Sequence, residues 1–211
     1  MPTIIAVDGP AGVGKSTSAR SLADELDLPF LDTGSIYRAL AWLANQNGID
    51  YSDEIGCCDL VDHYDIEITG PGRISIADQD ISDAIREPEA SMGSSLIAVH
   101  PELRRKLLGL QRTYALVGGC VLEGRDTGTV VFPDASIKFF LTADPAIRQA
   151  RASSRNNGAR TDIHIRDRID SSRAAAPLVP AHNAIVIDTS SMLLHQVVDK
   201  MITYYRDSIS V

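Results

Sequence analysis

Apolar and polar residues alternate in blocks along the N-terminal part of the chain. Residues 3–7 form an apolar run that indicates a buried strand, and residues 18–26 repeat apolar residues at helical spacing. Residues 28–32 predict a second short strand, and residues 35–46 predict a second helix that ends at Gly48. Two such strand–helix steps indicate an α/β fold, in which helices cover a parallel sheet.

The pattern changes between residues 50 and 89, where short alternating runs replace the longer blocks. Residues 65–69 and 73–76 each alternate, and the turn-forming residues 70–72 lie between them, which predicts a β-hairpin. Residues 78–81 could supply a further short strand. We therefore expect residues 50–89 to form a small β-rich insert that projects from the sheet edge.

The rest of the chain returns to helices and strands of ordinary length. The predicted strands span residues 120–123, 136–141 and 184–188, and the predicted helices span residues 90–99, 102–116, 166–175 and 192–205, with one more from Pro145. A polar stretch at about residues 152–168 is the natural candidate for a short lid. The chain is therefore expected to form one domain, with its core in residues 1–49 and 90–211.

Length and composition agree with one globular domain, since the 211 residues are 44% hydrophobic and 23% charged. No apolar run approaches the roughly 20 residues of a membrane span, and the N-terminus does not resemble a signal peptide. Cys57, Cys58 and Cys120 form an odd set without metal-ligand spacing, which favours free thiols. We therefore expect a cytoplasmic protein with no membrane contact.

Charge is distributed unevenly along the chain. The formal net charge is -8, but residues 1–100 hold 17 acids and 5 bases, whereas residues 101–211 hold 11 acids and 15 bases. The acidic balance argues against a protein built to bind nucleic acid. Eleven arginines lie between Arg104 and Arg173, and the planar guanidinium suits phosphate. This basic stretch either faces anionic ligands or forms a solvated basic surface.

A glycine-rich loop stands between the first predicted strand and helix. It matches the phosphate-loop pattern of Gly, four residues, Gly, Lys and Ser or Thr, in the strand–loop–helix context that the motif requires. Its backbone N–H groups and the helix N-terminus would hold a polyphosphate, Lys15 would reach the β- and γ-phosphates, and Ser16 would bind Mg²⁺. The alternative is a glycine turn that binds nothing. The residues expected to bind the polyphosphate are Gly9, Pro10, Ala11, Gly12, Val13, Gly14, Lys15, Ser16 and Thr17.

Polar clusters follow three other predicted strands, where ligands of open α/β sheets gather. They are residues 32–34, 124–126 and 188–189, and each could also be an ordinary turn. Glu123 ends its strand and could hold Mg²⁺ directly or through water, or it could simply form a salt bridge. Arg38 could reach a phosphate above the loop, or it could be a surface arginine.

A basic and acidic set lies on the predicted helix 166–175. Arg166, Asp170 and Arg173 are spaced so that they share one helix face. They form either a ligand-facing set or a surface ion pair. The five histidines form no Ser/His/Asp set and no metal-spaced cluster. This absence fits phosphoryl transfer, which depends on positioning and charge neutralisation more than on a general base.

Four motifs together resemble the bacterial-type cytidylate kinases, which have the nucleoside monophosphate kinase fold. They are residues 8–17, residues 32–38, residues 124–135, and a set formed by Arg166-Asp167, Asp170, Arg173 and Ala176-Pro177-Leu178. They cover most of the chain in the expected order, and the last two are specific to the family. The family often has Asp where Glu123 stands and an Arg pair where Arg151-Ala152 stands.

The resemblance implies a five-stranded parallel sheet sandwiched by helices, a nucleoside monophosphate-binding insert and a lid. It implies Mg²⁺-dependent transfer of the ATP γ-phosphate to CMP or dCMP, with Arg151 near the ATP. Lys15, Arg125, Arg166 and Arg173 would then act on the transferring group. The acceptor base would lie near Thr33, Ser95, Arg104 and Asp126, its phosphate near Arg38, Arg125 and Arg173, and its sugar near Arg166 and Asp170.

Three other functions remain open from the residues alone. A phosphate-loop kinase could use another small acceptor, such as UMP, AMP or shikimate. A nucleotide-dependent switch protein is a rival of a different class, although the chain has no Asn-Lys-x-Asp run to read guanine. A nucleic-acid-binding module would use the arginine-rich half of the chain, but the acidic first half argues against this function. The expected partners are small-molecule substrates only, and a monomer is expected.

Overall fold

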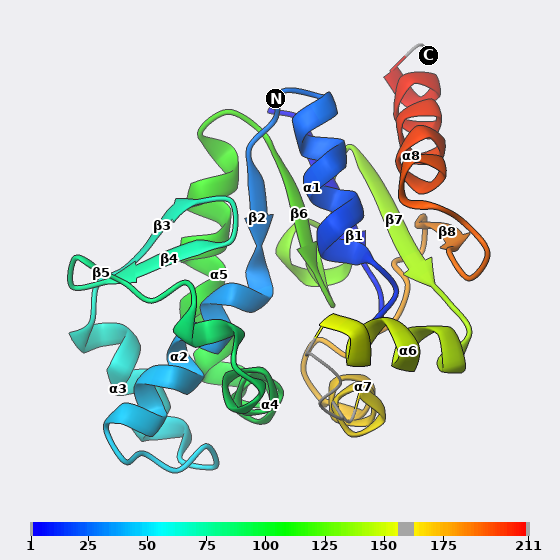
Figure 1. Ribbon diagram of the computed structural model, residues 1–211. Helices are drawn as coiled ribbons and strands as arrows, with labels where there is room; N and C mark the ends of the chain where they lie inside the picture. The colour runs from blue at the N-terminus through cyan, green and yellow to red at the C-terminus, as the bar shows by residue number, and fades with distance from the viewer. Residues whose placement is uncertain (1, 156–162, 210–211) are drawn as a thin grey trace.

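The core of the protein is a five-stranded parallel sheet with the strand order β2-β6-β1-β7-β8 (Figure 1). The computed structural model describes residues 2–155 and 163–209 of the chain. The strands are β1 Ile4–Asp8, β2 Phe30–Asp32, β6 Cys120–Gly124, β7 Ile137–Thr142 and β8 Ile185–Asp188. Every neighbouring pair runs parallel, so the predicted fold class is confirmed.

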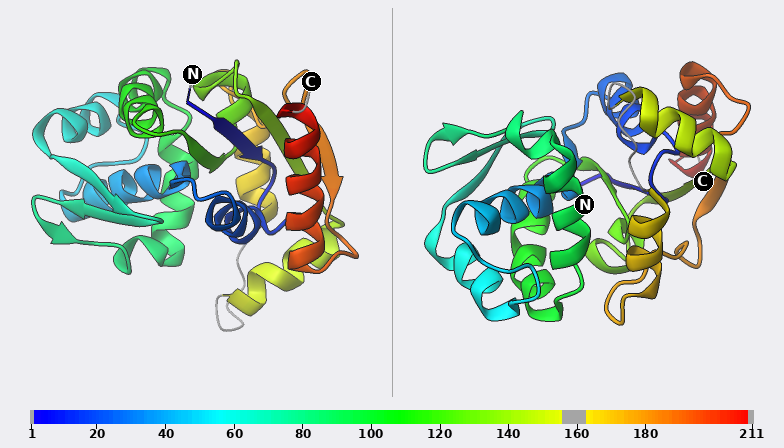
Figure 2. Two further views of the ribbon diagram at one scale, coloured as in Figure 1. Left: turned by 90° about the horizontal axis from the view of Figure 1, so that it is seen from above. Right: turned by 60° about the horizontal axis from the view of Figure 1, so that its bottom comes forward.

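Helices cover both faces of this sheet (Figure 2). The helices α1 Lys15–Glu25 and α8 Leu194–Ile209 lie against one face and share a hydrophobic core with Ile5 and Val7 of β1. Ile4 and Ala6 point the other way, because successive strand residues face opposite sides. Their core is completed mainly by α2 Thr33–Gln46 and α5 Pro101–Leu116, and α4 Pro88–Ile97 adds Ile97.

The strand order brings the polar strand ends to one edge. The last residue of β1, Asp8, pairs with Gly124 of β6, and Asp32 of β2 pairs with Glu123. The predicted clusters at residues 32–34 and 124–126 therefore lie beside the phosphate loop, which follows Asp8 directly. This is the edge at which open α/β sheets bind their ligands.

The insert contains the predicted hairpin and one unpredicted helix. Strands β3 Ile66–Gly70 and β4 Arg73–Ile76 pair antiparallel, and the short β5 Gln79–Asp80 adds to them. The helix α3 Glu54–His63 was missed, although Asp53 caps it by accepting from the Gly56 N–H at 3.0 Å. A short 3₁₀ turn, η1 Ala84–Arg86, links the insert to α4.

The C-terminal half differs from the predicted pattern at two places. The helices α6 Pro145–Arg155 and α7 Ile163–Ser172 contain residues 152–155 and 163–168 of the expected lid, and its residues 156–162 lie outside the described part of the chain. Because α7 ends at Ser172, Arg173 is not on the helix, and the expected shared helix face is wrong for that residue. A π-helical turn, η2 Thr127–Val131, follows the 124–126 cluster and was not predicted.

No helix in residues 2–155 and 163–209 combines the length and apolar character needed to cross a bilayer. The three cysteines are free and buried, as the composition suggested.

The first glycine of the loop should be required for stability. At Gly9 the backbone φ is +146°, and a Cβ would stand 2.3 Å from the backbone oxygen of Leu141 in β7. We expect Gly9→Ala to lower the free energy of unfolding by about 1–3 kcal/mol, because backbone atoms must move apart. Urea unfolding followed by circular dichroism measures the change.

Gly109→Ala is the matched control. Gly109 is exposed within α5, and nothing lies within 4 Å of a Cβ added there. It should gain about 0.5–1 kcal/mol, since alanine is the better helix former. Equal effects of the two substitutions would contradict the packing of the loop against β7.

Candidate active site

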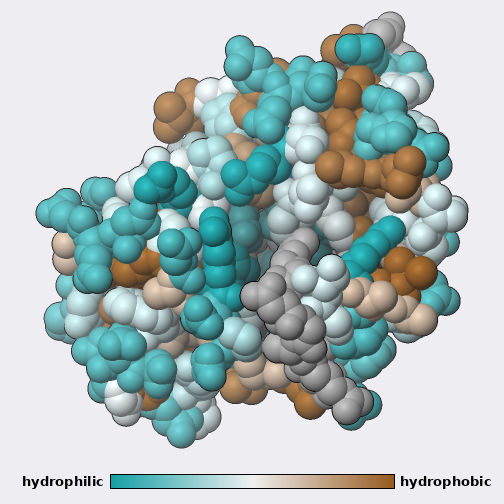
Figure 3. Space-filling model, viewed as in Figure 1, coloured by the Kyte–Doolittle hydropathy of each residue, from teal (hydrophilic) through white to brown (hydrophobic). Residues whose placement is uncertain are grey.

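A cavity of about 680 Å³ opens at the carboxyl edge of the sheet, between the insert and the helices α6 and α7. In the space-filling view hydrophilic side chains gather around the central hollow (Figure 3). Gly9 and Pro10 are the two expected site residues that do not line it. The others do: Ala11, Gly12, Val13, Gly14, Lys15, Ser16, Thr17, Thr33, Arg38, Ser95, Arg104, Glu123, Arg125, Asp126, Arg151, Arg166, Asp170 and Arg173.

The glycine loop wraps closely around the start of α1. Gly12 has φ +78°, and a Cβ there would meet the backbone oxygen of Arg148 in α6 at 2.6 Å. Asp167 of α7 accepts from the Ala11 N–H at 2.9 Å, and Arg148 Nη1 donates to the Ala11 oxygen at 3.0 Å. The loop is thus held from outside by α6 and α7, while α1 begins at Lys15 behind it.

Lys15 and Ser16 meet Glu123 at the floor of the cavity. Lys15 Nζ lies 3.8 Å from Glu123 Oε1 and donates to the Pro10 oxygen at 2.7 Å, and the Ser16 hydroxyl donates to Glu123 Oε2 at 2.9 Å. Burial, with the charge of Asp32, raises the pKa of Glu123. The structure therefore brings together Ser16 and Glu123, the two residues expected to hold Mg²⁺.

A buried ion pair forms the wall farther from the loop. Arg104 Nη2 of α5 donates to Asp126 Oδ2, and both side chains are 9% exposed. Arg104 Nη1 also donates to the Ala98 oxygen at 3.1 Å, and its guanidinium lies 5.4 Å from the ring centre of Tyr37. Thr33 is close by and donates its hydroxyl to the Glu123 backbone oxygen at 2.8 Å.

Asp170 forms ion pairs with two of the expected arginines. Arg125 Nε donates to Asp170 Oδ2 at 2.9 Å, and Arg173 Nη1 lies 3.6 Å from Asp170 Oδ1. Arg38 pairs instead with Asp32, with 2.7 Å between Nη2 and Oδ2. Burial would raise the pKa of Asp32, but the charge and hydrogen bond of Arg38 outweigh it and lower that pKa.

Arg166 and Arg151 occupy two further positions on the rim. Arg166 Nε donates to the Ser95 hydroxyl at 3.3 Å, and burial together with Arg125 lowers the pKa of Arg166 to about 10. Arg151 donates to the hydroxyl and the backbone oxygen of Thr189 at 3.0 and 2.8 Å. Thr189 in turn donates its hydroxyl to the loop oxygen of Val13 at 2.9 Å.

One buried donor in the lining of the cavity has no hydrogen-bond partner in the described residues. This donor is the Arg173 Nε, although Nη2 of the same side chain donates to the Ala176 oxygen at 2.9 Å. Burial lowers the pKa of Arg173, which an anionic partner would reverse. A phosphate oxygen would satisfy this donor and the neighbouring charge together.

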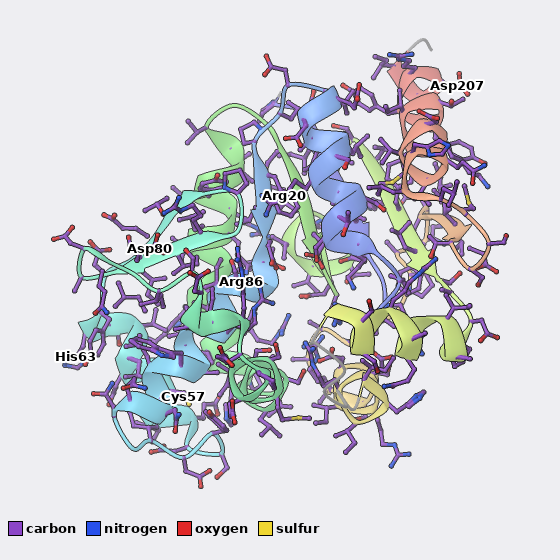
Figure 4. All side chains as sticks on the ribbon, in the orientation of Figure 1. Arg20, Cys57, His63, Asp80, Arg86 and Asp207 are labelled. Carbon is purple, nitrogen blue, oxygen red and sulfur yellow. The ribbon has the colours of Figure 1, made fainter. Side chains whose placement is uncertain are left out.

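Sequence reasoning missed the residues that the insert and α1 add to the cavity. Arg20 of α1 and Arg86 of η1 both line it (Figure 4). Arg20 also donates to the Pro71 oxygen of the hairpin turn at 3.0 Å and lies over Phe30. Neither arginine belongs to a motif, so only the folding of the insert onto the core reveals them.

Metal-binding clusters of the usual kind are absent from the described residues, since no three His, Cys, Asp or Glu side chains there come together. His63 and Cys57 lie on the insert, apart from the phosphate loop (Figure 4).

The family model described as cytidylate kinase matches residues 5–207. This chain belongs to the cytidylate kinase family. The cytidylate kinase of Pelotomaculum thermopropionicum (strain DSM 13744 / JCM 10971 / SI) is 46% identical over 212 residues, which are 94% of this chain and 93% of the relative. The resemblance inferred from four motifs is therefore confirmed.

Other relatives are about twice as long. The bifunctional pantoate ligase/cytidylate kinase of Prochlorococcus marinus (strain MIT 9303) is 39% identical over 217 residues, which are 96% of this chain but 44% of the relative. A second bifunctional relative, from Synechococcus sp. (strain CC9605), is matched over 46% of its length. The chain thus spans less than half the length of these two curated relatives.

Solved structures agree with the fold. A gluconokinase from Sinorhizobium meliloti 1021 superposes with a TM-score of 0.53 at 13% identity, over 98% of this chain and 93% of the other. A sugar kinase from Janibacter sp. HTCC2649 gives 0.50 at 19% identity, over 97% and 94%. At such low identity the likeness extends to the fold alone.

Binding of a polyphosphate at the loop should take up a proton. Burial, followed by the charge of Arg125, lowers the pKa of Lys15 to about 7 in the free protein. A bound polyphosphate favours the ammonium and raises that pKa again, so at about pH 8.5 binding should protonate Lys15. Calorimetric titration with a non-hydrolysable ATP analogue in two buffers of different ionisation enthalpy measures the uptake.

Lys15→Arg is the matched control for this experiment. It keeps the positive charge but stays protonated at every pH used, so its binding heat should not depend on the buffer. Buffer-independent heats in the wild-type protein as well would contradict the depressed pKa of Lys15.

Proposed function

We propose that this protein transfers the γ-phosphate of ATP to CMP or dCMP, giving CDP or dCDP and ADP. The observation that carries the proposal is the buried Arg104–Asp126 pair in the cavity that the phosphate loop also lines. The family and the named cytidylate kinase relative support the same reaction.

The pair matches the hydrogen-bonding edge of cytosine. Cytosine presents an amino donor at C4 and an acceptor at N3, so the Asp126 carboxylate would accept from the first and Arg104 would donate to the second. Uracil presents the opposite pattern and would face the carboxylate with a carbonyl. Each buried mismatch costs about 1–3 kcal/mol, and two of them disfavour UMP on the order of a hundredfold.

The remaining arginines would bind the acceptor phosphate and the sugar. Arg38, Arg125 and Arg173 suit the phosphate, and the unpartnered Arg173 Nε supports that role. Arg166, with Asp170, would face the sugar. When an acceptor arrives, the contacts of Arg125 and Arg173 with Asp170 would loosen in favour of charge-assisted bonds to phosphate.

The loop would hold ATP from the opposite side of the cavity. Lys15 would neutralise charge on the transferring group, Arg151 would lie near the donor nucleotide, and the loop N–H groups would orient the phosphates. The oxygen donors of Ser16 and Glu123, 2.9 Å apart, suit Mg²⁺ and would hold it. An ion held there would supply positive charge that offsets the negative charge of the phosphates.

We also propose roles for the insert and the lid, a cellular location and an oligomeric state. Gly72, Ser82, Ile85 and Arg86 of the insert line the cavity, which supports residues 50–89 as the acceptor-binding region. Residues 152–168 would serve as the lid over ATP. We further propose a cytoplasmic monomer whose partners are small nucleotides rather than nucleic acid, in line with the acidic net charge of -8.

A panel of acceptors tests the function directly. Release of ADP from Mg·ATP is measured with CMP, dCMP, UMP, AMP and shikimate. We expect kcat/KM for CMP or dCMP to exceed that for UMP by roughly a hundredfold, because of the two mismatches at the base. A higher value for any other acceptor would show that the proposed substrate is wrong.

Two variants link the outcome to the site. Asp126→Asn should narrow the ratio of CMP to UMP, since its amide can face either base. Asp134→Asn is the control, because Asp134 is exposed and does not line the cavity. If both variants leave the ratio of kcat/KM for CMP to that for UMP unchanged, Asp126 does not select the base.

A further inference from the structure

A buried carboxylate outside the expected site holds the turn that carries Asp126. Asp8, the last residue of β1, is 4% exposed. Its Oδ1 accepts from the Thr127 N–H at 2.9 Å and from the Thr127 hydroxyl at 2.8 Å, and its Oδ2 accepts from the Gly128 N–H at 2.8 Å. Both oxygens are thus committed to the first residues of η2.

One of these N–H groups, that of Gly128, is a group that Asp126 would ordinarily bind. Asp126 precedes η2 as its N-cap residue, and an aspartate there normally accepts from the N–H groups two or three positions ahead. The Asp126 side chain makes no such bond, and Gly128, two positions ahead, donates to Asp8 instead. The Asp126 carboxylate is therefore turned toward Arg104.

We propose that Asp8 is a positioning residue for base selection: it caps η2 in place of Asp126 and so leaves the Asp126 carboxylate facing the acceptor base. This inference rests on the proposed function. Asp8 does not line the cavity, so it acts through Asp126 and not by touching the acceptor.

The sheet makes this arrangement rigid. Asp8 stands between Gly124 of β6 and Phe140 of β7 in the register of the parallel strands. The next residue, Gly9, begins the phosphate loop. One strand end therefore joins the loop that would hold ATP to the turn that would select the acceptor.

Asp8→Asn should loosen this arrangement without changing the size of the side chain. An amide has one accepting oxygen and one donating NH₂, so it can match only one of the two backbone N–H groups. The other is left buried and unpaired, which is costly. The Asp126 carboxylate can relieve that cost by turning back to cap its own turn, and it then no longer faces the base.

The test measures kcat/KM for CMP and UMP in wild type, Asp8→Asn, Asp126→Asn and the double variant. Asp8→Asn should lower the CMP-to-UMP ratio about tenfold or more, for the loss of one charged hydrogen bond to the base. The double variant should show a ratio no lower than Asp126→Asn alone, because Asp8 acts through Asp126. The KM for ATP should change little.

Thr127→Val is the matched control. It removes the hydroxyl but keeps both backbone N–H bonds to Asp8, so the ratio should stay close to that of wild type. If Asp8→Asn does not fold, Asp8→Ser is measured instead. Its hydroxyl can accept from only one N–H group, and the same fall in the ratio is expected.

The outcomes separate this inference from the function on which it rests. A wild-type protein that prefers another acceptor overturns both. A wild-type preference for CMP that Asp8→Asn or Asp8→Ser leaves unchanged overturns the role of Asp8 alone. Effects of Asp8 and Asp126 on the ratio that multiply in the double variant also overturn it, since they would then act independently.

Discussion

Charge buried at one edge of a parallel sheet is the constraint on which the rest of this structure depends. Lys15, Arg104, Asp126, Asp170 and Arg173 are all buried. Burying a charge is costly unless an opposite charge and hydrogen bonds compensate it, so each of these groups needs a partner of opposite charge. Residues that end or follow β6 supply most of those partners, because Glu123, Asp126 and Arg125 pair with Lys15, Arg104 and Asp170. Arg173 pairs locally with Asp170. The same buried ion pairs therefore belong both to the packing of the fold and to the candidate site.

Such pairs add little to stability compared with apolar packing, while the removal of one partner is severe. We propose that their value lies in preorganisation, because donors and acceptors already stand where a ligand's charges would lie. Arg173 illustrates this: two of its nitrogens face Asp170 and the Ala176 oxygen, and its Nε faces no partner in the described residues. In our proposal the Asp8 carboxylate contributes to the same preorganisation, because it accepts the Gly128 N–H that Asp126 would otherwise bind.

The sequence predicts what depends on spacing and misses what depends on strand order. The phosphate loop was found because glycines, Lys15 and Ser16 stand at set intervals, and the sheet because apolar runs alternate with helical stripes. The Arg104–Asp126 pair joins residues 22 apart, and the bonds of Asp8 span 119 and 120 residues, so their partners could not be identified from periodicity. The helix α3 was missed because the neighbouring alternation dominated its region. Arg173 was placed on a helix because spacing does not show where α7 ends.

Replacing the Arg104–Asp126 pair as a unit tests the central claim most directly, that this buried pair serves acceptor recognition rather than stability. The free energy of unfolding and kcat/KM for CMP are measured for Arg104→Met, Asp126→Leu and the double variant. Each single change should cost about 3–5 kcal/mol, because it leaves a buried charge unpaired, whereas the double variant should regain most of that loss. Its kcat/KM for CMP should nevertheless stay on the order of a hundredfold or more below wild type. A double variant as unstable as the singles, or one that phosphorylates CMP like wild type, would contradict the account.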